Sequence, residues 1–495
     1  MSFTVTISTP DQSVETLTTV KPAPPSGISV LIIGAGPVGV FTALECWRKG
    51  HQVRILERNS APSTQGDFFT VTPQVIKHIQ TWPEMVDENE RIAPDPWISY
   101  HKITGEFLTE PAPFDLGSEL KPESADGTPH RPLRVYRHSR PKFLKMLLGQ
   151  LNRLGIKVEY GRRAVEYYED EDEEKAGVVL DGGQKLEADV VVAADGIGTK
   201  SHKLVSGHDI RAWSSGWASF RTAFPVERIM GDPELRERFK ILDGGHPHFE
   251  LWHGPGTHFA VFRNEDTISW LLMHKDTGTA KESWSESVSV DKVLDHLAEV
   301  VPGFSEQAKK LIRCTPEGGI IDWKLMWRNP QPNIVSPLGR VVQVGDAAHT
   351  FLPSSGGGVN QGIEGAISLA TCLELGGKDG IRWATKVHNK LRFERVSCCQ
   401  KVGFINQQRR NNPDMKAVER DPSIIKPEHG QWIWKHNPEQ YARDNYSKAL
   451  DHLQNGTAFQ NTNIPPGYTY EPWFVDDLMA DLEAGRPIKF AGDWS

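Results

Sequence analysis

The chain contains little cysteine and no long apolar segment. Its five cysteines, Cys46, Cys314, Cys372, Cys398 and Cys399, are scattered along 495 residues without a CxxC pair or a cluster at zinc-ligand spacing. This usage argues against a disulfide framework or a zinc site and fits a reducing compartment. No stretch approaches the ~20 apolar residues that cross a bilayer, and the start of the chain lacks the apolar segment of a signal peptide. We therefore expect a cytoplasmic protein with no stable membrane span and no metal.

Basic residues are fewer than acidic residues. Lysine and arginine total 56 against 64 aspartates and glutamates, so the formal net charge is −8. Proteins that bind nucleic acid through its phosphates are normally basic, and the sequence therefore predicts no nucleic-acid partner. Hydrophobic residues make up 38% and charged residues 24%, as in an ordinary globular protein. At ~150 residues per domain, the length predicts about three structural units.

A strand–helix–strand unit is predicted near the N-terminus. The apolar run ISVLII (28–33) predicts a buried strand. A helix is predicted over 37–49, with a proline at its start and Gly50 just past its end. QVRIL (52–56) predicts a second buried strand, which completes a βαβ unit.

The turn in this unit, GAGPVG, matches the G-x-G-x-x-G pattern of dinucleotide sites. Gly34 permits the tight turn, Gly36 lets the backbone approach a pyrophosphate, and Gly39 allows close helix–strand packing. Pro37 begins a helix whose N-terminus offers free N–H groups and a positive dipole end to phosphates. Glu57 ends the second strand, 23 residues after Gly34, where an acid hydrogen-bonds ribose hydroxyls. These features predict a dinucleotide site without separating NAD from FAD.

The remaining chain divides into two patterns. Between about Arg211 and Trp323, segments such as HFELWHG (248–254) alternate and are rich in aromatic residues, which predicts antiparallel strands of a second sheet. A helix is predicted over 142–155, two strands joined by an acidic tip over 157–180, and a buried strand over 189–196. A further buried strand followed by a glycine-rich turn is predicted over 340–349, and a helix near 361–375.

Two later motifs complete a specific combination with GAGPVG. They are AADGIGTKS (193–201) and GDAAHTFLPSSGGGVNQGIEGA (345–366). In this order and spacing, the three resemble the single-component FAD-dependent aromatic hydroxylases, the group A flavoprotein monooxygenases built on the para-hydroxybenzoate hydroxylase plan. The resemblance spans about residues 28–400 and includes SRPKF (139–143), and the tail is similar to fungal specialised-metabolite members.

The resemblance implies an α/β fold in which a Rossmann-like FAD-binding domain is interleaved with a mostly antiparallel β-sheet substrate domain, followed by a C-terminal helical tail. The expected divisions are a flexible arm (1–27), the first part of the FAD-binding domain (28–210, with a small substrate-domain insertion near 95–135), the substrate domain (211–325), the second part of the FAD-binding domain (326–395) and a helical extension (396–495).

The resemblance also implies a set of FAD contacts. Asp346 would bind the ribityl chain and Arg140 would lie near the flavin and pyrophosphate. A glycine-rich turn would follow the isoalloxazine edge, because residues without a Cβ let backbone N–H groups come close, and the next helix brings its positive end there. The expected cofactor-binding residues are Gly34, Gly36, Pro37, Gly39, Glu57, Arg58, Gly66, Arg140, Asp195, Asp346, Pro353, Gly357, Gly358, Val359 and Asn360.

The implied reaction uses NADPH or NADH as a transient electron donor, since the sequence contains one visible dinucleotide fold. Dioxygen then forms a flavin C4a-hydroperoxide, which hydroxylates or epoxidises an electron-rich aromatic, indole or alkene group of a small-molecule specialised metabolite. The protein must hold that carbon in place and exclude water.

Two residues of the second sheet are candidates for catalysis. Arg221, in SFRTAFP, lies where some relatives place an arginine over the flavin, and it would stabilise a phenolate or protonate an oxygen. An ordinary salt-bridge or cofactor-edge arginine is the alternative. His253 lies about where relatives carry a pocket tyrosine, although among 18 histidines a single one is more often structural. Phe249 and Trp252 are interpreted as core or pocket wall.

The chain departs from the family pattern at three positions. Thr199 and His202 stand where Ser and Arg usually follow the DG pair, so no specific NADPH contact is carried over to this loop. Gly365 replaces a usual Asp inside a predicted helix, at a cost of about 1 kcal/mol relative to alanine.

Two alternatives stay open. A flavin-dependent halogenase shares the G-x-G-x-x-G fold, but its W-x-W-x-I-P signature is absent, and the nearest match is Trp432-Ile433-Trp434 in the tail. The second alternative is a catalytically silent protein that binds FAD as a carrier. The substrate, the choice between hydroxylation and epoxidation, the choice between NADH and NADPH, and the oligomeric state are not predicted.

Overall fold

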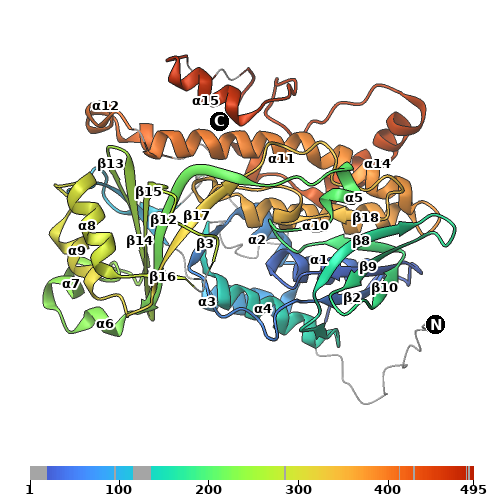
Figure 1. Ribbon diagram of the computed structural model, residues 1–495, viewed down its shortest axis with the longest axis horizontal. Coiled ribbons are helices and arrows are strands. Elements are labelled where there is room, and N and C mark those ends of the chain that lie inside the picture. Colours follow the sequence, from blue (N-terminus) through green and yellow to red (C-terminus); the bar gives the residue numbers. More distant parts are fainter. Residues whose placement is uncertain are drawn as a thin grey trace, which may run out of the picture.

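A computed structural model describes residues 19–93, 96–114, 135–283, 286–411, 413–426, 430–486, 488 and 491–494. Two large sheets, of five and eight strands, occupy the right and left parts of Figure 1. The expected arm (1–27) and the expected insertion near 95–135 lie partly outside the described residues. Within the described ranges, no helix is both long and apolar enough to cross a membrane.

The five-stranded sheet is entirely parallel. Alternate residues of its central strand enter different cores, Val30 and Ile32 on one side and Leu31 and Ile33 on the other. Burial on both faces explains why this strand is an uninterrupted apolar run in the sequence. The strand order is β18 (Val341–Gln343), β11 (Val190–Ala193), β1 (Ser29–Ile33), β2 (Gln52–Leu56) and β7 (Val158–Glu159).

Different layers cover the two faces of this sheet. On one face, apolar residues pack from α1 (Pro37–Arg48), α4 (Arg140–Arg153), α10 (Gly358–Gly376) and α11 (Ile381–Asn411). The other face is covered by a small antiparallel sheet of β8 (Ala164–Asp170), β9 (Lys175–Leu180) and β10 (Lys185–Ala188). The two strands predicted within 157–180 correspond to β8 and β9.

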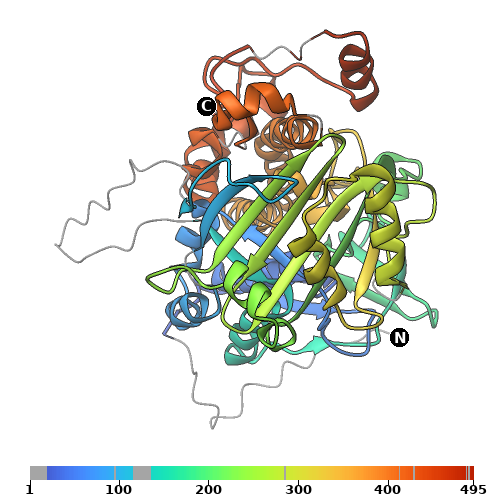
Figure 2. The ribbon, with the colours of Figure 1, turned by 90° about the vertical axis from the view of Figure 1, so that its left-hand side faces the viewer.

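The eight-stranded sheet is antiparallel except where β4 runs parallel to β13. Along β13, Phe249 and Leu251 lie on the face of the sheet that lines a cavity, whereas Trp252 lies on the other face, in the core shared with α8 (Val290–Val300) and α9 (Glu306–Arg313). Figure 2 shows these two helices lying over the outer face of the sheet. The strand order is β16 (Ser287–Val288), β17 (Ile320–Trp327), β12 (Trp213–Pro225), β15 (Thr267–Lys275), β14 (Thr257–Arg263), β13 (His248–Gly254), β4 (Trp97–Lys102) and β5 (Ala112–Pro113).

Shorter elements complete the fold. A two-stranded antiparallel sheet of β3 (Phe68–Val71) and β6 (Tyr136–Ser139) precedes α4. The other helices are α2 (Pro73–Ile79), α3 (Pro83–Ile92), α5 (His202–Ser206), α6 (Glu227–Met230), α7 (Pro233–Arg238), η1 (Gly345–Ala347), η2 (Pro353–Ser355), α12 (Met415–Arg420), η3 (Pro422–Ile425), α13 (Gln431–Trp434), α14 (Pro438–Asn455) and α15 (Val475–Glu483).

Helix α11 links the two halves of the molecule. It has 31 residues and runs across the upper part of Figure 1, below α15, from the side of the parallel sheet to the side of the eight-stranded sheet. The division expected between residues 395 and 396 therefore falls inside a continuous helix.

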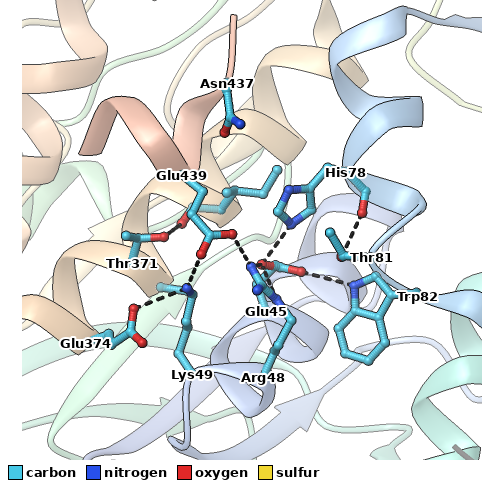
Figure 3. A network of polar contacts seen from close by, with 12 residues as sticks. Glu45, Arg48, Lys49, His78, Thr81, Trp82, Thr371, Glu374, Asn437 and Glu439 are labelled. Atoms are coloured by element: carbon cyan, nitrogen blue, oxygen red, sulfur yellow. Dashed lines mark hydrogen bonds and ion pairs between the residues drawn. The ribbon is translucent and has the colours of Figure 1, made fainter. Parts of the chain in front are cut away.

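A polar network holds α14 to the end of α1 (Figure 3). Glu439 accepts hydrogen bonds from Arg48 Nη2 over 2.5 Å and from Lys49 Nζ. Lys49 Nζ also lies 3.1 Å from a carboxylate oxygen of Glu374 on α10. Burial alone would raise the pKa of Glu439, but the hydrogen bonds and charges of Lys49 and Arg48 lower it to about 2. Glu439 is therefore ionised at neutral pH and ties the C-terminal helices to the parallel sheet.

Candidate active site

A cavity of about 340 Å³ lies between the carboxyl edge of the five-stranded sheet and the inner face of the eight-stranded sheet. Its walls come from the loops after β1, β11 and β18 and from inward-facing residues of β12, β13, β14 and β15. Ligands of open α/β sheets bind outside the carboxyl ends of the strands. This cavity is therefore the candidate active site.

The loop after β1 forms a close-fitting cradle with one open position. Gly34 has φ +109°, and a Cβ added there would lie 2.4 Å from the carbonyl oxygen of Ala194. A Cβ on Gly39 would lie 2.0 Å from the carbonyl oxygen of Gly34. Gly36 lines the cavity, and an added Cβ there would have no protein atom within 4 Å. The loop therefore has no room for a side chain at Gly34 or Gly39, where it packs against backbone. At Gly36 it is open, and a ligand can approach there.

Three expected contact residues lie beside this cradle and not on the cavity wall. Glu57 accepts hydrogen bonds from the backbone N–H groups of Ala35 (2.9 Å) and Asn59 (2.8 Å), which fixes it next to the loop. Arg58 is exposed. Asp195 accepts a hydrogen bond of 2.7 Å from the hydroxyl of Tyr167, while the following Gly196 lines the cavity.

The second glycine-rich turn lines the same cavity as the first loop. Pro353, Gly357, Gly358 and Val359 line the cavity, as predicted for residues that meet a ligand. Asn360 is buried instead, and its Nδ2 donates hydrogen bonds to the carbonyl oxygens of Gly356 (2.7 Å) and Thr70 (2.9 Å). Asn360 therefore holds the turn against β3.

Asp346 and Arg140 also line the cavity. Gly66 makes room for Arg140: it has φ +132°, and an added Cβ would lie 2.8 Å from the Arg140 Cδ. The loop that carries Asp346 is held from behind by Arg328, which is 2% exposed and donates from Nη2 to the backbone carbonyl of Asp346. His202, which replaces an expected arginine, contacts Arg328 through Nε2 and not the cavity.

Arg221 lies on the cavity wall in a buried ion pair with Asp67. Arg221 Nε donates to Asp67 Oδ2 over 2.9 Å, and Nη2 donates to Oδ1 over 2.5 Å. Arg221 is 5% exposed and Asp67 is 6% exposed. Although burial alone would raise the pKa of Asp67, the charges of Arg221 and Arg140 lower it. Asp67 is therefore an anion, and it orients Arg221.

The structure does not bring the second catalytic candidate to the cavity. His253 is fully buried on β13, and its neighbour His258, on β14, lines the cavity instead. His258 Nδ1 lies 2.9 Å from Oδ1 of Asn411 at the end of α11. Burial and the charge of Arg410 lower the pKa of His258 to about 3, so the ring is neutral. Of the two aromatic residues interpreted as core or pocket wall, Phe249 lines the cavity and Trp252 does not.

Four titratable residues of the wall were not predicted from the sequence: Asp67, Arg137, His258 and Arg410. Asp67 follows Gly66 directly, and an acid next to a glycine before a short strand was an available signal. Arg137 and Arg410 come from β6 and the last turn of α11, and no local pattern marks them. The tail motif Trp432-Ile433-Trp434 lies on α13, and none of its residues lines the cavity.

The cavity fits a flavin dinucleotide. Gly36 and Gly357 are the N-cap residues of α1 and α10, and both line the cavity. The first N–H groups of a helix have no partner within it and carry a partial positive charge, so each terminus suits a phosphate or an anionic ring edge. Fold and cavity together define a dinucleotide-binding oxidoreductase of the interleaved two-sheet type.

The chain belongs to the FAD binding domain family, whose model matches residues 27–378. It is 40% identical to the FAD-dependent monooxygenase fsr3 of Gibberella fujikuroi, over 95% of this chain and 90% of that protein. It is 41% identical to the FAD-dependent monooxygenase dmxR9 of a Cryptosporiopsis species, over 95% and 91%. The crystal structure of CtdE in complex with FAD and a substrate matches with a TM-score of 0.76 at 27% identity, over 86% of this chain and 100% of CtdE. The resemblance stated from the motifs is confirmed, and the chain is an FAD-dependent monooxygenase.

Proposed function

We propose that this monooxygenase consumes NADPH or NADH and inserts one oxygen atom of dioxygen into an electron-rich aromatic, indole or alkene group of a specialised metabolite. The second oxygen atom leaves as water, and the two electrons come from the nicotinamide. One observation carries the proposal: a single cavity has the nucleotide cradle on one side and the aromatic face of the eight-stranded sheet on the other.

The residues divide the work between cofactor and substrate. When bound, FAD supplies electron transfer from the nicotinamide to dioxygen and the activation of one oxygen atom. The cradle around Gly36, the side chains of Asp346 and Arg140, and the turn at Gly357 hold the cofactor. Phe249 and Phe262 provide an apolar wall that positions a flat substrate and excludes water.

Arg221 acts on the reacting end of the substrate in this proposal. Its position is fixed by Asp67, so its charge is oriented before the substrate arrives. A preorganised cation of this kind stabilises negative charge that develops on oxygen during transfer. His253 has no direct part in the proposal, because it does not line the cavity.

The proposal includes a division into domains and a cellular location. Residues 28–210 and 326–395 would form the FAD-binding domain, 211–325 the substrate domain, and 396–495 an extension that begins within α11. The absence of a described helix able to cross a membrane and the composition of the chain support a cytoplasmic enzyme.

The test is oxygen incorporation. The purified protein is incubated with NADPH or NADH, ¹⁸O₂ and a panel of phenols, indoles and prenylated analogues, and products are measured by mass spectrometry. We expect a product that carries one ¹⁸O atom per nicotinamide oxidised. Product formation that requires chloride or bromide would favour a halogenase, and the failure of NADPH and NADH oxidation with every compound would favour a silent carrier.

A further inference from the structure

A second, much smaller cavity adjoins the turn that carries Asp346. Its volume is about 20 Å³, and its wall comes from the segment before β18, from β18 itself, from the residues after the Asp346 turn, and from α10 and α11. Val344 lines both this cavity and the candidate active site. A water molecule needs a cavity of roughly 10–15 Å³ on the same measure, so the space suits one water.

Gly365 opens this cavity on the side of α10. It is buried inside the helix and lines the cavity, and a Cβ added there would have no atom of the described residues within 4 Å. Glycine inside a helix is less stable than alanine, and alanine would meet no obstacle here. Crowding therefore does not explain the glycine, whereas a use for the space beside it would.

The cavity wall contains several buried polar atoms that lack a partner. Burial of a donor or acceptor without a hydrogen bond is costly, and native proteins nearly always supply one from the chain or from ordered water. Four residues that line this cavity are less than a tenth exposed and carry such an atom, which has no hydrogen-bond partner among the described residues: Gln343 Oε1, His349 Nδ1, Arg392 Nε and Gln400 Oε1.

Two of these atoms determine the kind of ligand that fits. Gln400 Nε2 donates to the Thr350 carbonyl oxygen over 2.8 Å, so Gln400 Oε1 can only accept. Arg392 Nη1 donates to Glu364 Oε2 over 2.7 Å, and Arg392 Nε can only donate. An anion would face the Gln400 oxygen, and a cation would face the Arg392 guanidinium. Water both donates and accepts, so it satisfies both residues.

His349 connects this cavity to the turn that carries Asp346. Its backbone N–H donates to the Gly345 carbonyl oxygen over 2.9 Å and closes that turn. Burial is the main cause that lowers the pKa of His349 to about 3, and the charges of Arg392 and Arg328 add to it. The ring is therefore neutral, and Nδ1 can pair with a water molecule as donor or as acceptor.

We propose that the cavity beside Gly365 is a binding site for one buried water molecule, which joins His349 to Arg392 and Gln400. The water holds the Asp346 turn against α11, and Gly365 leaves the room that it needs. These residues position the cofactor loop and touch neither FAD nor substrate.

The first experiment compares two glycine-to-alanine variants by thermal unfolding of the FAD-loaded protein. Gly149 lies inside α4, where the atom nearest to an added Cβ is Arg153 Nη1 at 4.0 Å. Gly149→Ala should therefore raise the Tm by about 1 °C, because alanine favours the helix. Gly365→Ala should lower the Tm by about 2 °C or more, because its methyl group takes the place of the water and leaves polar atoms unpaired.

Serine variants at the same two positions give a second, independent comparison. Serine is a poorer helix former than alanine, so Gly149→Ser should be less stable than Gly149→Ala. At residue 365 the order should reverse, because the serine hydroxyl can replace some of the hydrogen bonds of the displaced water. A general sensitivity of α10 to substitution would not produce this reversal.

The second experiment observes the site directly. A crystal structure of the FAD-loaded protein should show an ordered water within about 2.7–3.2 Å of at least two of the four unpartnered atoms, and Gly365→Ala should lack it. Titration of the apoproteins with FAD should show an affinity lowered by roughly threefold to tenfold in Gly365→Ala and unchanged in Gly149→Ala.

Several results would overturn the proposal. A Tm that rises in Gly365→Ala as it does in Gly149→Ala would show that the space has no polar occupant. A wild-type crystal structure without the water would remove the site. An anomalous signal at the site from crystals soaked in bromide would identify an anion in place of water. An unchanged FAD affinity in Gly365→Ala would show that the water does not hold the Asp346 turn.

Discussion

Arg221 Nε donates to Asp67 Oδ2 across 2.9 Å, and this ion pair joins the eight-stranded sheet to the loop that precedes β3. Both residues lie on the cavity wall and are less than a tenth exposed. A buried pair of this kind leaves an uncompensated charge when one partner is removed. Arg140 lies 3.6 Å from the Asp67 carboxylate, however, so this carboxylate would keep one cationic neighbour after loss of Arg221.

Arg221→Gln is therefore expected to fold, to retain near-normal FAD, and to lower the rate of oxygen transfer by ~100-fold, as the loss of one preorganised donor does in other enzymes. Nicotinamide oxidation should continue, with hydrogen peroxide in place of product. The measurement is the ratio of product to nicotinamide oxidised, with peroxide counted in the same sample. A wild-type ratio contradicts a catalytic role, and a parallel loss of FAD and of all activities indicates a structural arginine. The double variant with Asp67→Asn tests whether any such loss comes from the unpaired carboxylate.

Asp346→Ala should weaken FAD binding by about tenfold to a hundredfold, because an unpaired buried polar partner costs about 1–3 kcal/mol. The Asp346 loop is also held by Arg328 through the backbone, so its shape should persist without the side chain. FAD affinity is measured by titration of the apoprotein, with Asp346→Asn as the conservative comparison. Unchanged affinity in the alanine variant would place Asp346 away from the cofactor.

Gly36→Ala and Gly39→Ala should behave in opposite ways. An added Cβ at Gly36 meets no protein atom within 4 Å, and its φ of −71° suits alanine, so the apoprotein should keep its Tm. FAD affinity should fall by roughly tenfold, because the methyl group occupies the approach to the cradle. At Gly39 the Cβ would lie 2.0 Å from the Gly34 carbonyl oxygen, so the fold itself should be destabilised by about 1–3 kcal/mol. A normal FAD affinity in Gly36→Ala would show that no ligand approaches there.

Glu439→Gln should lower stability at neutral pH by roughly 1–3 kcal/mol, because Arg48 and Lys49 lose their shared carboxylate. The folded-state pKa of Glu439, about 2, is below its ordinary value of 4.5. Its contribution is therefore complete above about pH 4.5 and is lost as the pH falls toward 2. Thermal unfolding at a series of pH values should show the gap between wild type and variant closing below pH 4.5. Glu483→Gln, at an exposed residue of α15, is the control and should show no gap. A gap independent of pH would contradict the ionic origin.

The cofactor side of the site could be predicted because its requirements are local. Gly34 and Gly39 are needed by the turn itself, where any side chain would collide with backbone. Pro37 and the glycines near 357 mark helix starts, and buried parallel strands are recognisable as apolar runs. Each of these signals lies within a few residues of the structure that it specifies.

The substrate side could not be predicted in the same way. Arg137 and Arg410 are 273 positions apart in the sequence, and both line the cavity only because β6 and the end of α11 reach it. His253 and His258 lie on neighbouring strands, and the hairpin register determines which of them lines the cavity. The division expected at residue 396 fell within α11, because a helix that spans two packed units carries no break in its own pattern.

The parallel sheet has a consequence for synthesis of the protein. Its central strand β1 comes from residues 29–33, but β18, whose following loop carries Asp346, comes from residues 341–343. At ribosomal rates of roughly 5–20 residues per second, the early strands wait on the order of 15–60 s for the edge strand of their own sheet. During that interval β1 and β2 expose apolar surface, and until residue 254 has been made β4 also lacks its parallel partner β13. The nucleotide-binding cradle is therefore complete only after α10 has left the ribosome.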